Sequence, residues 1–285
     1  MPLRALLLVL AAAAMHTGWN FLVKRAKDKQ VFTWWAMIIG SLVYLPLLTL
    51  YRPIPAQIWP YALSSACVEA VYYNTLVRAY THGDFSLVYP VARGAAPALL
   101  AVWATLFLGE RPHCAGIVGL SLVLIGLLVV GSGQWRSQRQ GVSLPRGGIG
   151  AALATALCIS IYSAIDGAAV RLMAPTPYTV LVFALTGLFV APLVFRQYGY
   201  HDVVAVWRTD WVRILAVGIL TLLTYILVLQ AYTIAHVSYV GALREVSIVL
   251  AALAGWRWLG EAFGALRTVG ALLIFVGIVV IATAG

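Results

Sequence analysis

The sequence predicts an all-α membrane protein: ten transmembrane helices arranged as two inverted repeats of five helices each. The first observation is composition, because 62% of the residues are hydrophobic, 10% are charged, and the mean hydropathy is +0.94. Soluble domains carry about 25% charged residues, so this chain is suited to lipid. The other two observations are a series of apolar runs of bilayer length and an internal sequence repeat.

The apolar runs are separated by charged or turn-forming residues, and each is close to the ~20 residues that cross a bilayer. The first run has no convincing cleavage site and leads into Lys24 and Arg25, so we interpret it as a helix, not as a signal peptide. The predicted spans are 3–23, 31–51, 59–79, 85–108, 113–131, 148–170, 178–196, 211–233, 238–259 and 264–284. A polar stretch, 132–147, connects the first repeat (1–131) to the second (148–285).

The repeat appears as identical residues in one register. Adding 151 to five positions of the first half gives identical residues in the second. Arg93, Gly109, Glu110, Gly119 and Gly126 correspond to Arg244, Gly260, Glu261, Gly270 and Gly277. Because each repeat has an odd number of helices, the second copy enters the membrane from the opposite face, which makes the repeats inverted.

Span 85–108 contains Arg93 between Pro90 and Pro97. An arginine in hydrocarbon costs several kcal/mol unless it faces a wet cavity or a partner, and a proline frees a backbone carbonyl. We therefore expect a broken helix that faces the interior of the bundle. Its prolines, with Gly241 in the second repeat, are the predicted hinges.

Glycines at the same spacing in both halves mark two further features of the repeat. The Gly-Glu pairs at 109–110 and 260–261 each follow a span, which predicts a helix-ending turn, with gating by the carboxylates as the alternative. In spans 113–131 and 264–284, paired glycines lie seven residues apart on one helical face, where backbones can approach closely. We expect these two helices to be supports, and their faces are candidates for a homodimer contact.

Five ionisable residues lie within the spans away from their ends: Glu69, Arg93, Asp166, Arg244 and Glu245. Two are basic and three acidic, so pairing nearly balances them. For Asp166, Arg244 and Glu245, locking of helices and a role in transport are both open. The side chains of Arg244 and Glu245 point about 100° apart on a helix, so we expect separate partners.

Polar and aromatic residues inside the spans predict a substrate pocket. Glu69 lies halfway along span 59–79, one turn from Tyr72 and Tyr73, and is suited to bind an ammonium, carry a proton or pair with His16. His16 and Asn20 share a face of span 3–23. The predicted substrate-binding residues are His16, Trp19, Asn20, Glu69, Tyr72, Tyr73, Arg93, Tyr225 and Tyr239.

No catalytic motif is visible: the chain has no GxSxG, HExxH or Walker loop, so we predict that it is not an enzyme. Cys67, Cys114 and Cys158 have no CxxC or Cys/His metal spacing, and we expect no metal or other cofactor. The formal charge of +10 does not indicate nucleic-acid binding, because the basic residues lie in short loops without a contiguous patch.

The basic residues in the loops predict the orientation in the cell inner (plasma) membrane. Apart from Arg93 and Arg244, 17 of the 19 Lys and Arg residues remain, of which 13 fall on one predicted side and four on the other. Those four are Arg4, Arg52, Arg111 and Arg171. The side richer in Lys and Arg faces the cytoplasm, so both termini are predicted outside.

Three motifs carry a resemblance to a known family. They are His16-Thr17-Gly18-Trp19-Asn20 with Lys24-Arg25, the stretch from Tyr89 to Pro97, and the Gly-Glu pairs after spans 85–108 and 238–259. With ten helices in two repeats, the chain resembles the EamA-domain branch of the drug/metabolite transporter superfamily over essentially its whole length. The resemblance implies that the first, third, fourth, sixth, eighth and ninth spans surround a central cavity, with the fifth and tenth peripheral.

The resulting functional prediction is a secondary transporter that exports small metabolites by alternating access. Within the superfamily the pattern is nearest to an amino-acid exporter, so neutral and aromatic amino acids are the expected substrates. One alternative is a transporter of anionic metabolites such as sugar phosphates or nucleotide sugars, which needs more inward-facing cations than Arg93 and Arg244. The other is a membrane-embedded enzyme, which needs a reactive cluster near one interface.

Overall fold

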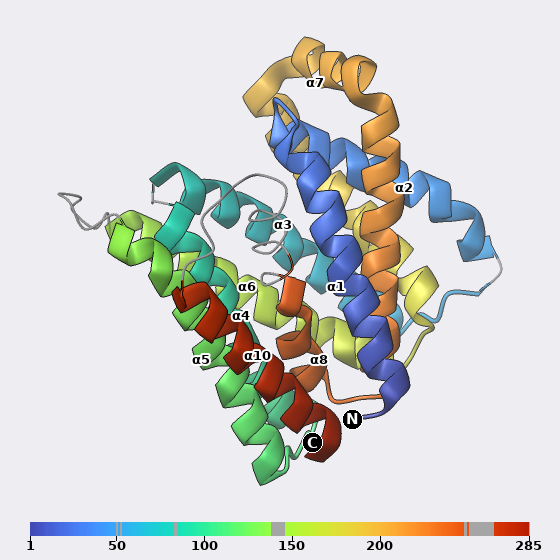
Figure 1. Ribbon diagram of the computed structural model, residues 1–285. Helices are drawn as coiled ribbons and strands as arrows, with labels where there is room; N and C mark the ends of the chain where they lie inside the picture. The colour runs from blue at the N-terminus through green and yellow to red at the C-terminus, as the bar shows by residue number, and fades with distance from the viewer. Residues whose placement is uncertain are drawn as a thin grey trace.

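The computed structural model describes residues 1–49, 51, 53–82, 85–137, 146–247, 250 and 265–284 of the chain. Within these ranges every regular element is an α-helix (Figure 1). The helices are α1 (Leu3–Lys24), α2 (Lys29–Thr49), α3 (Ile58–His82), α4 (Phe85–Phe107), α5 (Cys114–Ser137), α6 (Arg146–Ala169), α7 (Pro175–Tyr232), α8 (Val237–Arg244) and α10 (Ala265–Ala284).

The long element α7 contains two predicted spans, 178–196 and 211–233, joined by residues that the sequence predicted as a loop. These joining residues are helical except at Gly199 (φ 73°, ψ 164°) and Asp210 (φ −122°, ψ 17°), where the backbone leaves helical geometry. Glycine adopts such a positive φ without strain because it has no Cβ. The chain turns over at the top of the molecule there (Figure 1).

Part of the predicted repeat cannot be compared. Span 238–259 begins as α8, but residues 248, 249 and 251–259 and the Gly260–Glu261 pair lie outside the described residues. The same holds for residues 138–145 of the connecting stretch. The count of ten helices, the inverted repeat and the boundaries at 131 and 148 therefore stay predictions.

Four helices in the described part of the chain are long and apolar enough to cross a membrane. They lie at Leu3–Val23, Lys29–Thr49, Gly150–Ala169 and Pro175–Tyr232. Large apolar side chains are exposed on the outside, among them Phe107 at 74% and Phe275 at 64%. Such exposure is costly in water and favourable in lipid, so the protein is a membrane protein.

Helices of the first half pack mainly against helices of the second half. The most extensive pairs are α2 with α7, α5 with α10, α3 and α4 with α6, and α1 with α7 (Figure 1). Contacts between α4 and α5, within the first half, are fewer. The two halves are therefore interleaved around a shared core.

Close backbone packing between α5 and α10 is confirmed. A Cβ added at Gly119 would lie 2.8 Å from the Gly277 carbonyl oxygen, and one at Gly126 would lie 2.7 Å from the Gly270 oxygen. The glycine faces thus meet each other inside one chain. A homodimer through these helices stays a prediction and would have to use their other faces.

A second close crossing joins α2 to α7 and was not predicted. A Cβ on Gly218 would lie 2.6 Å from the Ala36 carbonyl oxygen and 2.9 Å from the Gly40 nitrogen. Both neighbours are backbone atoms, which cannot move aside as the end of a flexible side chain can. Only glycine at Gly218 therefore allows α2 and α7 to approach this closely.

The first Gly-Glu pair ends α4 as predicted. Gly109 has φ +68°, a left-handed conformation common just after a helix end, and the Glu110 N–H donates back to the Ala104 carbonyl oxygen at 3.1 Å. The Glu110 carboxylate then accepts hydrogen bonds from the Val237 N–H, from the Ser238 N–H (3.2 Å) and from Ser238 Oγ (2.6 Å). A carboxylate from the end of α4 thus caps the N-terminus of α8.

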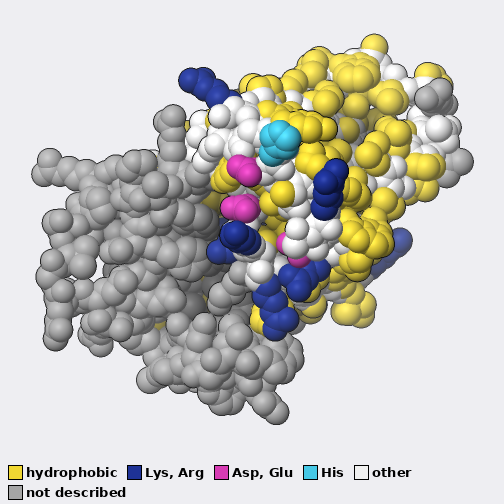
Figure 2. Space-filling model, turned by 90° about the horizontal axis from the view of Figure 1, so that it is seen from above, with side chains coloured by type: hydrophobic (Ala, Val, Ile, Leu, Met, Phe, Trp, Pro, Cys, Tyr) yellow, Lys and Arg dark blue, Asp and Glu magenta, His cyan; other side chains and the backbone are white. Residues whose placement is uncertain are grey.

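The two chain termini lie at the same end of the bundle (Figure 1). The Met1 amine donates to the carbonyl oxygens of Ile281 (3.4 Å) and Ala282 (3.2 Å). Viewed from the opposite end, Lys and Arg side chains gather on the surface beside a few acidic ones (Figure 2). The orientation of these ends in the membrane stays a prediction.

Candidate functional site

Five ionisable side chains from four helices lie inside the bundle, four of them buried and Arg93 partly buried, and we call them the charged centre. They are Glu69 of α3, Arg93 of α4, Asp166 of α6, and Arg244 and Glu245 at the end of α8. Asp166 and Glu245 are 0% exposed, Arg244 is 7% and Glu69 is 9%. Charges at such depth require partners or a functional ligand.

The basic half of the charged centre is built around Glu245. Arg93 Nε lies 3.2 Å from Glu245 Oε2, and Arg244 Nε lies 3.8 Å from Glu245 Oε1. The prediction of separate partners for Arg244 and Glu245 is therefore wrong. That prediction assumed that one regular helix contains both residues. In the structure α8 ends at Arg244, and the Glu245 N–H donates to the Ala242 carbonyl oxygen at 3.1 Å in a tighter turn.

His16 of α1 extends the basic half. Its Nε2 lies 3.1 Å from an Arg93 terminal nitrogen. A guanidinium only donates, so His16 Nε2 is the acceptor and the ring is in a tautomer that leaves this nitrogen unprotonated. The Trp19 ring meets His16 edge-on at 4.7 Å between centroids. The Trp19 indole N–H is buried and has no partner within the described part of the chain.

The acidic half is held by hydroxyl groups of α7. Tyr178 donates to Asp166 Oδ1 at 2.6 Å, and Tyr225 donates to Asp166 Oδ2. Thr186 donates to Glu69 Oε2 at 2.8 Å. These bonds satisfy lone pairs without neutralising the carboxylates. Since Glu69 and Asp166 interact electrostatically with each other and with Arg244, the two halves belong to one centre.

Aromatic rings border the charged centre. Tyr72 and Tyr162 meet edge-on with centroids 6.0 Å apart, and Phe183 lies 5.4 Å from Tyr225. Tyr72, Tyr162 and Tyr225 pack in one cluster with Ala96 of α4. Rings of this kind bury apolar side chains of varied shape while their hydroxyls keep hydrogen bonds.

Of the nine predicted substrate-binding residues, the structure brings six to this region: His16, Trp19, Glu69, Tyr72, Arg93 and Tyr225. Asn20 is exposed, and its amide donates to the His16 carbonyl oxygen of its own helix at 2.7 Å. Tyr73 turns toward α2 and donates to the Gln30 carbonyl oxygen. Tyr239 stacks on His236 and packs against Gly116 of α5. The predicted pairing of Glu69 with His16 is replaced by the Thr186 and Arg93 contacts.

The predicted site omitted Asp166, Tyr162, Tyr178, Thr186, Arg244 and Glu245. The three charged ones stood out in the sequence as ions inside apolar runs, and a pocket role for them was left open. Tyr178 and Thr186 carried no such signal, because a tyrosine or threonine is ordinary in a membrane span. No group of three or more His, Cys, Asp or Glu side chains suited to a metal occurs among the described residues.

Comparison with known proteins defines the family. The EamA-like transporter family matches residues 3–132 and 146–283, together well over half of the chain. No curated protein matches the sequence significantly. A solved structure described as "Crystal structure of protein" is similar with a TM-score of 0.77 at 20% identity, over 99% of each chain, which shows a shared fold. The chain therefore belongs to the EamA-like transporter family of the drug/metabolite transporter superfamily, and it is a membrane transporter, not an enzyme.

Proposed function

We propose that the protein is a secondary transporter that exports neutral and aromatic amino acids by alternating access. The single observation that carries this proposal is the charged centre, which has a basic half and an acidic half next to aromatic rings. An amino acid presents a carboxylate, an ammonium and a side chain. The three chemical features of the site match these three groups.

The basic half supplies the place for the substrate carboxylate. Arg93 and Arg244 supply the positive charge there, and the buried Trp19 N–H is a donor nearby. The acidic half supplies the place for the ammonium, because Asp166 and Glu69 accept hydrogen bonds from neutral hydroxyls, which carry no positive charge. Tyr72, Tyr162 and Tyr225 then border the side chain.

Charge balance disfavours an anionic substrate in the site. With all five members ionised, two arginines face three carboxylates, so the charged centre has a net charge of −1. A neutral amino acid is a zwitterion and leaves this total unchanged, with its ammonium at the acidic half and its carboxylate at the basic half. A phosphorylated substrate would instead add two negative charges to a centre whose arginines already contact Glu245. The centre therefore favours zwitterions over sugar phosphates.

The test is counterflow of labelled substrates into proteoliposomes that contain the full-length protein. The substrates are leucine, phenylalanine, lysine, aspartate and a sugar phosphate. We expect transport of leucine and phenylalanine, with lysine, aspartate and the phosphate excluded. Glu69→Gln and Asp166→Asn keep shape and lose charge, so each should lower amino-acid transport by about tenfold. The matched control is Asp202→Asn, an exposed carboxyl of α7.

Each outcome bears on a separate part of the proposal. Wild-type protein that transports none of the amino acids would overturn the substrate class, and transport of the sugar phosphate alone would replace it with anionic cargo. Equal transport by wild type, Glu69→Gln and Asp166→Asn would remove the acidic half from the mechanism. A fall that also occurs in Asp202→Asn would show a general effect of charge.

A further inference from the structure

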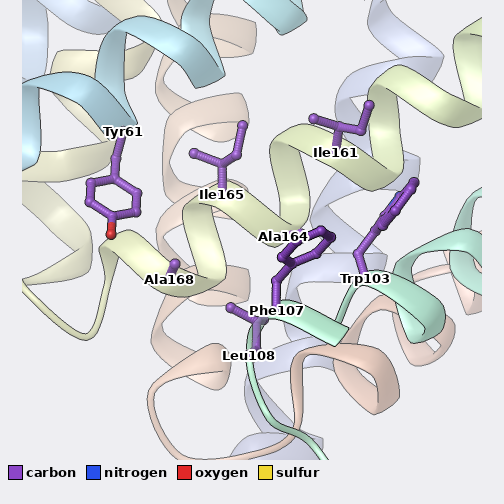
Figure 3. A pocket seen from close by; sticks show the side chains of 8 residues that line it. All are labelled: Tyr61, Trp103, Phe107, Leu108, Ile161, Ala164, Ile165 and Ala168. Atoms are coloured by element: carbon purple, nitrogen blue, oxygen red, sulfur yellow. The ribbon is translucent and has the colours of Figure 1, made fainter. Parts of the chain in front are cut away.

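An apolar groove runs along the outside of the bundle between α3, α4 and α6 (Figure 3). Its volume is about 470 Å³, within the range of small-molecule sites. Ile161, Ile165 and Ala168 form the floor, since their spacing of four and three residues places them on one face of α6. Trp103 and Phe107 of α4 form a wall on one side.

The groove has no unpaired polar group among these five residues. The Trp103 indole N–H donates to Ser160 Oγ at 3.0 Å, which leaves the ring surface as the part that faces the groove. Phe107 is 74% exposed. The floor belongs to the membrane-spanning segment Gly150–Ala169, so the groove opens at the depth of lipid chains.

One end of the groove carries a cation. Arg171 follows the end of α6 by two residues and is exposed. One terminal nitrogen of its guanidinium donates to the Leu108 carbonyl oxygen at 3.2 Å, and Leu108 lines the groove. That bond uses one of five N–H donors. Because the apolar span ends at Ala169, Arg171 lies at the depth where lipid phosphates are found.

We propose that this groove is a binding site for one anionic phospholipid, with an acyl chain along α6 and the phosphate on Arg171. Ten residues separate Ile161 from Arg171, which is about 15 Å along a helix and suits an extended hydrocarbon chain. The apolar side chains give an acyl chain van der Waals contacts along its length, and the guanidinium adds a charge-assisted contact that a zwitterionic headgroup matches less well.

The test is native mass spectrometry of the full-length protein in detergent with phosphatidylglycerol or phosphatidylcholine added. Ala168→Phe fills the floor, and Ala14→Phe, at an exposed position of α1, is its matched control. Arg171→Gln removes the cation, and Arg4→Gln, also exposed, is the control for charge. Size-exclusion chromatography of each variant checks folding and reports any dimer.

We expect wild type and both controls to retain one phosphatidylglycerol in preference to phosphatidylcholine. Ala168→Phe should lower the affinity for both lipids by about tenfold or more. Arg171→Gln should lower the affinity for phosphatidylglycerol by about fivefold and abolish the preference. Equal retention in Ala168→Phe and Ala14→Phe, or an unchanged preference in Arg171→Gln, would overturn the proposal. A dimer that Ala168→Phe dissociates would assign the groove to a second copy. Because Arg171 is exposed, we expect Arg171→Gln to fold. If Ala168→Phe fails to fold, the lipid preference of Arg171→Gln alone tests the proposal.

Discussion

Glu245 is the residue on which the basic half of the charged centre depends. It is fully buried, and it contacts arginines from two helices, Arg93 of α4 and the adjacent Arg244 of α8. Removing one partner of such a pair leaves a buried charge uncompensated, which costs much more than replacing both partners by apolar groups. The contact therefore limits substitution in a way that an exposed ion pair does not.

This difference can be measured with a double-mutant cycle. Arg93→Met should lower the free energy of unfolding by roughly 3 kcal/mol, and the double variant Arg93→Met/Glu245→Met should recover much of that loss. The control is Arg213→Met, because Arg213 and Asp210 form a pair at 3.2 Å in which the Arg213 side chain is 52% exposed; such pairs contribute about 0–1 kcal/mol. The measurement is denaturant unfolding in micelles. Losses that simply add in the double variant would show that Arg93 and Glu245 are not coupled.

The members of the charged centre could be located from the sequence, but their partners could not. A charge inside an apolar run is costly, so Glu69, Arg93 and Asp166 stood out without any structure. Thr186, in contrast, is 117 residues from Glu69 and looks like any other threonine in a span. Tyr73 is a residue that the sequence placed in the pocket, because it lies about one turn from Glu69. Its hydroxyl instead donates to the Gln30 carbonyl oxygen of α2, a contact that spacing along one helix does not reveal.

At the scale of helices, the absence of a Cβ at Gly218 sets how closely α2 and α7 can approach each other. Apart from α7, which contains two predicted spans, and α8, of which only part is described, the observed helices lie close to the predicted spans, because a bilayer demands runs of a fixed length and polarity. The polar end of α5 was predicted as loop but continues as helix to Ser137, since nothing in that stretch forbids helical geometry. Crossings depend on side-chain size at one or two positions, which a hydropathy pattern does not report.

Gly218→Ala is the test of the α2–α7 crossing. The new methyl group would lie 2.6 Å from the Ala36 oxygen, so the helices must separate, and we expect a loss of about 1–3 kcal/mol. Gly150→Ala in α6 is the matched control, because no atom lies within 4 Å of the added Cβ. That variant should gain about 0.5–1 kcal/mol from helix propensity. Thermal unfolding in detergent compares the two, and equal effects would mean that the crossing tolerates separation.

The sequence predicts that the whole molecule is asymmetric in charge, with 13 loop Lys and Arg residues on one side and four on the other. Both termini lie at one end, and basic side chains gather on the opposite end (Figures 1 and 2). The sequence assigns the loops richer in Lys and Arg to the cytoplasm, by the preference of these residues for that side. Orientation cannot be read from packing, because the helices would pack identically in either direction.

Reporter fusions test this orientation. A reporter that is active only outside the cytoplasm should be active when fused after Gly285 and inactive when fused after Ser137, at the end of α5. The physical reason is that translocating the end rich in Lys and Arg is unfavourable, whereas the end that carries the termini has few cations. The measurement is reporter activity in intact cells at matched expression. Activity after Ser137 alone would reverse the orientation.

The cap that Glu110 places on α8 also fixes an order of events during synthesis. The carboxylate leaves the ribosome 127 residues before the Val237 amide that it binds. At about 5–20 residues per second, this corresponds to roughly 6–25 s. Through that interval Gly109 can already close α4 on its own backbone, but the acidic group has no helix terminus to meet. The nascent first half must therefore keep this carboxylate hydrated at the membrane surface until α8 emerges, and this corner of the protein is among the last to assemble.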